Sequence, residues 1–455
     1  MASQAGNRLS DKILRWQELW LAFFYKSFRP AAPDIRKSPQ RGILFLDMSY
    51  TLKMFQERHL EQALVSRKLG GYFSHVISVH PLAGLFATGC DRFGVPVVSR
   101  LDETHVFIEG KIGVSSRLRW LPPLNLILAQ VNLIRLVLRL SREAKVDVVR
   151  VGDPYYLGLM GWLLAHWLHI PLVIRVCFNY DQLYETTSKP VFPRLFVFRA
   201  IEKMIEKFIF HRCDLIAGAN ENNMNYGLEN GGRREVATIF RYGNLIHEDH
   251  WRDPGARQAP DTILAELGLT GDRFLVTVAR LEAMKCVDDT IRVIGELVRR
   301  GHKIRGLIIG DGACREQLQS MAAALGVGRQ VVFAGNRDQK WIAAVLPRAE
   351  VIVSPHMGRA LAEAALAGVP IVAFDYDWQR EVVADGEAGY LVPNKDWLAL
   401  ADKAEMLLKD RVSAGKMGEK ARRRIFEMMD PRKMEEHERN EYEKLFARHS
   451  PCERP

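Results

Sequence analysis

The residues most suited to chemistry lie in one stretch of the second half of the chain, residues 354–375. The apolar segments 351–353 and 371–374 predict two parallel strands, and the alanine-rich segment between them predicts a helix that begins at Gly358. A helix N-terminus at the carboxyl end of a parallel strand offers unpaired N–H groups to an anion, and glycine lets a phosphate or sugar approach the backbone. Glu363 lies in the same helix, where its carboxylate can accept hydrogen bonds from ribose hydroxyls. The alternative is an ordinary strand-helix-strand crossover with Glu363 facing solvent.

Strands alternate with helices along both halves of the chain, and this pattern predicts the elements that position the stretch. In the first half we expect strands at residues 42–48, 75–79, 96–99, 146–151, 171–176 and 214–218, and helices at 55–69, 124–144, 157–168 and 195–211. In the second half we expect strands at residues 274–279, 304–309, 331–333, 351–353, 371–374 and 389–392, and helices at 287–300, 314–325, 340–346 and 396–409. The fold class is therefore α/β, with two Rossmann-like doubly wound parallel-sheet domains that face each other across a cleft.

The domain boundaries follow from length and composition. A chain of 455 residues is too long for one ordinary core. We expect an amphipathic arm at residues 1–38, a first Rossmann-like domain at 39–245, a polar linker at 246–262, a second Rossmann-like domain at 263–430, and a C-terminal helix and tail at 431–455 that returns toward the first domain.

The charge balance and the cysteines indicate the surroundings of the protein. Lys and Arg number 64 against 54 Asp and Glu, a net charge of +10, which favours an anionic partner such as a membrane surface, nucleic acid or a phosphorylated ligand. We expect no nucleic-acid role, because no groove of clustered basic and stacking aromatic residues is visible. The six cysteines show no metal-ligand spacing, which is typical of reduced thiols and predicts a cytoplasmic location.

Residues 8–30 carry apolar side chains at helical spacing, including Trp16 and Trp20, with basic residues at the sides and ends. This composition predicts an interfacial helix on an anionic membrane surface, at the inner face of the membrane. An arm packed on the protein's own surface or on another subunit is the alternative. Charged residues, histidines or a proline interrupt the apolar runs at 124–140 and 155–178, so we expect no transmembrane helix.

An ordered set of motifs in the second half carries a family resemblance. The motifs are Val278-Ala-Arg280-Leu281 followed by Lys285 and Val287-Asp288-Asp289, then Gly310-Asp311-Gly312, Val332-Phe333-Ala334-Gly335, Ala362-Glu363-Ala364 and Gly368-Val369-Pro370. In order and spacing this set resembles the donor domain of retaining glycosyltransferases of the GT-B fold, the glycosyltransferase family 4-like enzymes. The resemblance covers about residues 274–425, whereas the first half agrees in strand order alone.

The resemblance implies a reaction and the residues that carry it. A sugar would pass from a UDP- or GDP-linked donor with retention, through front-face attack, and with no cofactor or obligatory metal. Arg280 and Lys285 would be catalytic, because the donor diphosphate gains negative charge as the glycosidic bond breaks. Solvated loop cations are the alternative interpretation of this pair. Donor binding would also use Gly310, Asp311, Asn336, Gly358, Arg359, Ala360 and Glu363.

The chain departs from the family pattern at several positions. Pro355 stands where the first of two family glutamates is common, and Val176 is followed by Cys177 where a histidine is frequent. Asp375 and Asp377 form an Asp-x-Asp triplet, for which loop capping by Asp375 is a simpler interpretation than metal binding.

The acceptor is expected to bind to the first domain and to the N-terminal arm. Five residues near strand ends are candidates for the acceptor site or the cleft: His80, Asp153, Asn179, Asp181 and His356. We therefore predict a peripheral membrane glycosyltransferase that uses a nucleotide-sugar donor and a glycan or lipid acceptor. The alternatives are a catalytically silent scaffold that binds nucleotide or a partner, and a nucleotide-sugar epimerase on the same fold.

Overall fold

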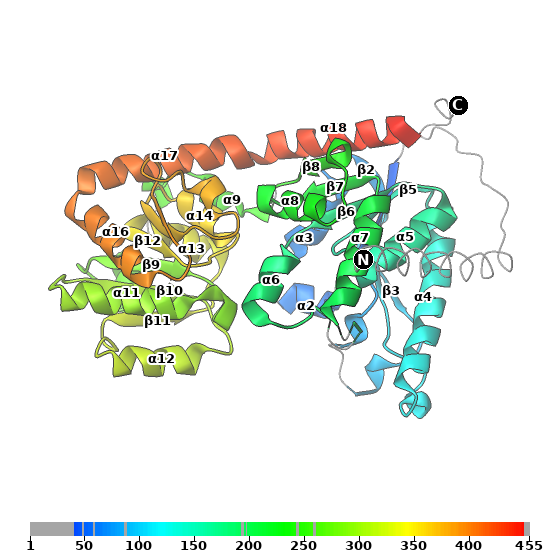
Figure 1. Ribbon diagram of the computed structural model, residues 1–455, viewed down its shortest axis with the longest axis horizontal. Helices are drawn as coiled ribbons and strands as arrows, with labels where there is room; N and C mark the ends of the chain where they lie inside the picture. Colours follow the sequence, from blue (N-terminus) through cyan, green and yellow to red (C-terminus); the bar gives the residue numbers. More distant parts are fainter. Residues whose placement is uncertain are drawn as a thin grey trace, which may run out of the picture. The chain divides into compact units, whose positions relative to one another are not determined.

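The computed structural model describes residues 41–449, with gaps at 48–49, 58–59, 86–88, 193–194, 197, 243–244 and 258–260. The expected amphipathic helix at residues 8–30 lies outside the described residues. The described chain contains one sheet of eight strands and one sheet of six, each flanked by helices (Figure 1). This architecture confirms the expected fold class of two Rossmann-like parallel-sheet domains.

The first sheet has the strand order β3-β4-β2-β1-β5-β6-β7-β8, in which only β3 runs antiparallel to its neighbour. Its strands are β1 (Arg41–Leu46), β2 (Phe73–His80), β3 (Val97–Arg100), β4 (His105–Glu109), β5 (Val146–Val151), β6 (Leu172–Val176), β7 (Leu215–Gly218) and β8 (Ala237–Ile239). Its helices are α2 (Leu52–Glu57), α3 (Glu61–Val65), α4 (Pro122–Glu143), α5 (Tyr156–Leu168), α6 (Tyr180–Thr187), α7 (Arg199–Arg212) and α8 (Glu221–Glu229).

The second sheet is entirely parallel, with the order β11-β10-β9-β12-β13-β14. Its strands are β9 (Phe274–Val278), β10 (Arg305–Ile309), β11 (Val331–Gly335), β12 (Val351–Ser354), β13 (Ile371–Phe374) and β14 (Tyr390–Val392). The helices that follow the first domain are α9 (Glu248–Trp251), α10 (Asp261–Glu266), α11 (Val287–Arg299), α12 (Arg315–Ala324), α13 (Gln339–Val345), α14 (Ala360–Ala365), α15 (Gln379–Val382), α16 (Trp397–Lys409), α17 (Arg411–Met429) and α18 (Pro431–His449).

Strand β9 shows how the second sheet is buried on both faces. Phe274, Val276 and Val278 enter one hydrophobic core, whereas Leu275 enters the core on the other face. A strand that buries alternate side chains in two cores reads as a continuous apolar run, because neither face meets water. The sequence therefore predicted the strands of this sheet to within one or two residues at each end.

Several elements differ from the sequence-based expectations. The helix expected at 55–69 is divided into α2, α3 and a short 3-10 turn, which ends where Leu69 adopts a φ of 48°. Strand β4 was not expected, because His105 and Glu109 at its ends shorten its apolar run. The expected helix at 195–211 begins only at Arg199, because the extended backbone of Phe198 precedes it. Part of the expected linker is helical, in α9 and in the start of α10.

Helix α4 is long and apolar, and it passes a simple test for a membrane span. Among the described residues it is the one helix long and apolar enough to cross a bilayer by length and composition alone. Length and composition are weak evidence for a membrane span, since core helices pass the same test. Inside the fold, 33% of the apolar window of α4 is buried. Ala129, Leu133 and Val137 recur at intervals of four residues on the buried face, as expected for a helix packed on a sheet.

Each sheet contains a switch point, where the order of the strands changes direction. β1 lies next to β5 in the first sheet, and β9 lies next to β12 in the second. In open α/β sheets, ligands bind outside the carboxyl ends of the strands at such points. Asp47 and Asp153 follow β1 and β5, and Arg280 and His356 follow β9 and β12.

The last two helices connect the two domains. Ile425 and Met429 of α17 are buried in the core of the second domain. Tyr442 and Leu445 of α18 are buried in the core of the first. Arg150 of β5 donates from Nη1 to Glu438 Oε1 of α18 at 2.5 Å, so a buried ion pair fixes the end of the chain to the first sheet.

We expect Glu438→Ala to lower the free energy of unfolding by about 3 kcal/mol, because it leaves the buried guanidinium of Arg150 without its carboxylate. Glu436→Ala is the matched control, since Glu436 is an exposed glutamate of the same helix and should change stability by less than about 0.5 kcal/mol. Urea denaturation of both variants measures the difference. Equal stabilities would show that the ion pair does not hold α18 in place.

Candidate active site

Lys285 is a buried cation near the carboxyl end of β9. After β9 the chain passes through Arg280 into a 3-10 helix, Ala283–Lys285. Lys285 is only 9% exposed, yet within the described part of the chain its ammonium makes no hydrogen bond or ion pair. A buried ammonium is costly unless a negative charge compensates it. Lys285 is therefore suited to hold an anionic ligand.

Other charges around Lys285 add to this property. Burial lowers the pKa of Lys285, Arg280 lowers it further, and Asp377 and Glu282 oppose the shift. Arg280 is exposed and donates from Nη1 to Glu282 Oε1 at 2.8 Å. The two cations predicted to be catalytic are thus near enough to repel each other. A diphosphate between them would relieve that repulsion.

The loop before α14 lies against Lys285. Gly358 has a φ of 65°, and a Cβ atom at this position would lie 3.4 Å from Lys285 Nζ. Helix α14 begins at Ala360 rather than at Gly358, and it has only six residues. This corrects the expected start of the helix and weakens the predicted contribution of its dipole, which sums over aligned peptides. Glu363 is buried, and its Oε1 lies 3.5 Å from Arg359 Nε.

The remaining donor-binding candidates follow β10 and β11. Gly310 has a φ of 134°, and a Cβ atom there would lie 2.0 Å from the carbonyl oxygen of Ala279, so only glycine fits. The backbone oxygen of Asp311 accepts from Leu281 N at 3.0 Å, which ties this loop to the one that carries Arg280. Asn336 is exposed beyond the end of β11. The loops after β9, β10 and β12 therefore meet, with Asn336 at their margin.

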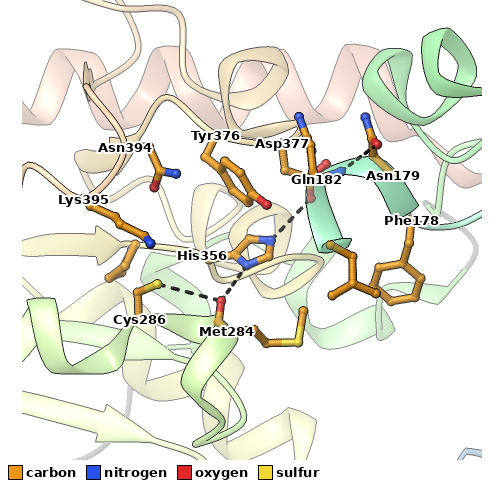
Figure 2. Close-up of a pocket in the computed structure, with 12 residues that line it drawn as sticks. Phe178, Asn179, Gln182, Met284, Cys286, His356, Tyr376, Asp377, Asn394 and Lys395 are labelled. Carbon is orange, nitrogen blue, oxygen red and sulfur yellow. Dashed lines mark hydrogen bonds and ion pairs between the residues drawn. The ribbon is translucent and has the colours of Figure 1, made fainter. Parts of the chain in front are cut away.

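His356 lies in a small cavity that residues of both domains line (Figure 2). Its Nδ1 lies 3.0 Å from the carbonyl oxygen of Met284, and its Nε2 lies 3.4 Å from Asp377 Oδ2. Because a carbonyl oxygen can only accept, Nδ1 carries a proton. Asn179 of the first domain lines the same cavity and caps α6 by accepting from Asp181 N and Gln182 N.

A second cavity, of about 440 Å³, opens at the switch point of the first sheet. Residues at the carboxyl ends of β1 and β5 line it, together with β6, the segment before α3 and one residue of α18. Its polar side chains include Asp47, Tyr50, Arg67, Arg150, Asp153, Arg175, Tyr180, Tyr242 and Glu438. Phe178 lines both cavities, so the two lie side by side.

Asp153 is the acceptor candidate that the structure places in the larger cavity. It is 2% exposed, and its Oδ1 accepts from Tyr155 N at 2.8 Å. Its Oδ2 has no hydrogen-bond partner among the described residues. Burial raises the pKa of Asp153 to about 7, against the hydrogen bonds from backbone N–H groups. Asp153 can therefore change protonation near neutral pH.

Two other acceptor candidates line neither cavity. His80 is completely buried and stacks on Phe107 with ring centroids 4.6 Å apart. Burial lowers the pKa of His80 to about 3, so its ring is neutral and packs as a core side chain. The carboxylate of Asp181 accepts from Arg199 at 2.6 Å and from Lys203 at 2.8 Å. These contacts hold α6 against α7.

The two aspartates of the Asp-x-Asp triplet have different partners. Asp375 accepts from Arg380 Nε at 2.8 Å. Asp377 accepts from Asn222 Nδ2 of the first domain at 3.0 Å. The described residues contain no group of three or more His, Cys, Asp or Glu side chains placed to hold a metal ion. That catalysis needs no obligatory metal stays a prediction.

Two features of the site were not predicted from the sequence. The first is the set of arginines in the larger cavity, of which Arg150 and Arg175 lie within otherwise apolar strands. A charged residue inside an apolar run was the available signal, since such residues are seldom buried without a purpose. The second is the interdomain contact of Glu381, a residue that the sequence indicated to be structural at the start of a helix. It accepts from Glu221 N at 2.8 Å and from Arg241 Nη1 at 2.6 Å.

Known glycosyltransferases are similar to this chain in sequence. Residues 261–424 match the family model described as glycosyl transferases group 1. Alpha-D-kanosaminyltransferase of Streptomyces kanamyceticus is 28% identical over 265 residues, which cover 57% of this chain and 67% of that protein. Phosphatidyl-myo-inositol mannosyltransferase of Mycobacterium leprae is 37% identical over 134 residues, which cover 28% of this chain and 31% of that protein.

A solved structure extends the comparison to the first domain. HepE from Anabaena in complex with UDP superimposes with a TM-score of 0.65 at 17% identity, over 89% of this chain and 100% of that one. At this identity the likeness establishes the fold. Residues 261–424 thus match the model of the glycosyl transferases group 1 family, and the chain that contains them has the GT-B fold.

Proposed function

We propose that this chain is a retaining glycosyltransferase that moves a sugar from a nucleotide-diphosphate sugar to a membrane-associated acceptor. The observation that carries the proposal is Lys285, a buried ammonium with no partner among the described residues, beside Gly358 and near Arg280. The complex of HepE with UDP supports a nucleotide donor. The named activity of the phosphatidyl-myo-inositol mannosyltransferase supports a lipid acceptor.

The two cations favour the transition state over the bound donor. As the glycosidic bond breaks, the diphosphate leaving group gains negative charge, and positive groups already fixed around it stabilise that charge. Arg280 supplies a planar guanidinium able to make paired hydrogen bonds, and Lys285 supplies a point charge. In the retaining reaction the acceptor hydroxyl attacks from the face that the diphosphate leaves, and the leaving phosphate oxygen takes up its proton. No metal ion is assigned a role in this scheme.

The acceptor is assigned to the larger cavity, next to the interdomain cavity. Asp153 Oδ2 faces no protein donor among the described residues, so it is available to an acceptor hydroxyl. When ionised, Asp153 would accept a hydrogen bond from that hydroxyl and orient it.

A silent scaffold is the second candidate, because Pro355 occupies the position of a family glutamate. Transfer of sugar by the purified protein would exclude it.

We further propose that the protein works at the inner face of the cytoplasmic membrane. The amphipathic composition of residues 8–30 supports this location. In the described chain, Trp120 is 71% exposed next to Arg119, and Leu124 and Ile127 of α4 are also exposed. Exposed apolar side chains beside basic residues suit an anionic lipid surface.

Replacing Lys285 should separate stability from activity. Lys285→Met removes an unpaired buried charge, so we expect the free energy of unfolding to rise by about 1–3 kcal/mol while turnover falls at least about 100-fold. Lys303→Met is the control, because Lys303 is exposed ahead of the amino end of β10. Donor hydrolysis or transfer, and thermal denaturation, measure the two effects. Wild-type turnover in Lys285→Met would refute this donor site.

Asp153→Asn should change the response to pH. Because burial raises the pKa of Asp153 to about 7, the folded protein keeps a proton that the unfolded chain releases. The contribution of Asp153 to stability should therefore fall as pH rises from about 4 to 7, so the stability of Asp153→Asn relative to the wild type should increase over this range. The wild-type rate of transfer should increase with pH through 7, and in the variant it should be low and independent of pH. Parallel pH profiles in the two proteins would contradict the assignment.

Membrane binding can be measured by sedimentation with vesicles. The full chain should sediment with vesicles that contain phosphatidylglycerol and remain in solution with phosphatidylcholine alone. Deletion of residues 1–38 should reduce binding at least about tenfold, because both the apolar face and its basic flanks are lost. Unchanged binding after the deletion would assign membrane contact to another surface.

A further inference from the structure

A row of six alternating arginine and aromatic side chains lies at the larger cavity, and all of them except Phe240 line it. Arg67 and Arg150 each lie 5.1 Å from the ring centroid of Phe45. Arg150 and Arg175 lie 5.8 and 5.9 Å from the ring centroid of Phe240. Arg175 also lies 5.0 Å from the ring of Tyr242. We call these six residues the arginine row.

The three cations of the row are not equally neutralised. Arg150 binds Glu438 and Tyr442 of α18. Arg67 binds Asp47 through Nη2 at 2.7 Å, while its Nη1 is buried and has no hydrogen-bond partner among the described residues.

Arg175 is the least satisfied cation of the row. It is 8% exposed, and it makes no hydrogen bond or ion pair from its guanidinium within the described chain. Stacking on Phe240 and Tyr242 fixes the guanidinium without using its N–H donors. The row therefore retains positive charge and free N–H donors inside a cavity.

The row also leads toward the donor site. Burial raises the pKa of Tyr242, whereas the positive charges of Arg175 and of Arg359 both lower it. Tyr242 therefore lies within electrostatic reach of an arginine of the acceptor cavity and of an arginine in the predicted donor loop. A ligand held by Arg175 would lie in the larger cavity, which adjoins the interdomain cavity at Phe178.

We propose that the acceptor carries a phosphate or carboxylate group, which Arg175 binds while a hydroxyl of the same molecule faces the donor sugar. This inference rests on the proposed function, because it names the acceptor of that transfer. A cavity of about 440 Å³ is large enough for a sugar or polyol of one ring with its anionic group. Guanidinium binds such groups through paired, charge-assisted hydrogen bonds.

The test compares charged and neutral probes on the full chain. Calorimetric titration with myo-inositol 1-phosphate and with glucuronate should show binding, whereas myo-inositol and glucose should bind at least about tenfold more weakly. Arg175→Gln should weaken binding of the charged probes at least about tenfold, and Arg175→Lys should restore part of it, because the charge remains and the paired hydrogen bonds are lost. Arg135→Gln, an exposed arginine of α4, should bind them like the wild type.

Two further measurements identify the source of the anion and separate a failure of this inference from a failure of the proposed donor site. Vesicles of phosphatidylinositol test whether a lipid headgroup is the ligand, and Arg175-dependent binding to them without binding of the soluble probes would assign the anion to a lipid. Equal binding of charged probes by wild type and Arg175→Gln, or a clear preference for neutral sugars, would overturn the proposal. UDP and GDP titrations of the wild type serve as the separate check. If the wild type binds nucleotide but neither the charged probes nor the vesicles, this inference alone is rejected, whereas absence of nucleotide binding rejects the donor site.

Discussion

Parallel strands present their carboxyl ends at one edge of a sheet, and this constraint decides where the polar groups of the protein gather. In the second sheet the loops after β9 and β12 bring Lys285 next to Gly358. In the first sheet the ends of β1 and β5 bring Asp47 and Asp153 to one cavity. Strand β9 is apolar and buried on both faces, so the charged side chains of this part of the fold gather beyond its carboxyl end.

A buried cation is the common feature of the donor loops and of the larger cavity. Lys285 and Arg175 are both buried, and both lack a carboxylate partner among the described residues. Their placement is energetically costly in the absence of an anion, so structural reasons alone do not account for them. A nucleotide diphosphate at the first cation and an anionic acceptor at the second would offset that cost.

Residues of both domains join across the region between the sheets. Glu381 of α15 accepts hydrogen bonds from Glu221 N and Arg241, and Asp377 accepts one from Asn222. The long C-terminal helices reinforce this link, since α17 packs in the second domain and α18 in the first. These contacts join the two domains without using the side chains of Lys285 or Arg175.

Much of this arrangement was visible in the sequence, for a physical reason. Strands buried on both faces read as apolar runs, and the motifs around Arg280 and Glu363 fixed the donor domain. The residues of the proposed acceptor cavity could not be predicted from the sequence in the same way, because they come from distant strands and from α18. His80 and Asp181 lay at suitable strand ends but pack or pair structurally. Arg175 was overlooked because one arginine in an apolar strand gives no sign of what it faces.

A crystal structure of the protein with UDP or GDP would show whether the diphosphate binds at Lys285. We expect the diphosphate within hydrogen-bond distance of Lys285 Nζ and beside the backbone of Gly358, with Arg280 turned from Glu282 toward the phosphates. A diphosphate bound elsewhere, with Lys285 still buried and unpaired, would refute the proposed donor site.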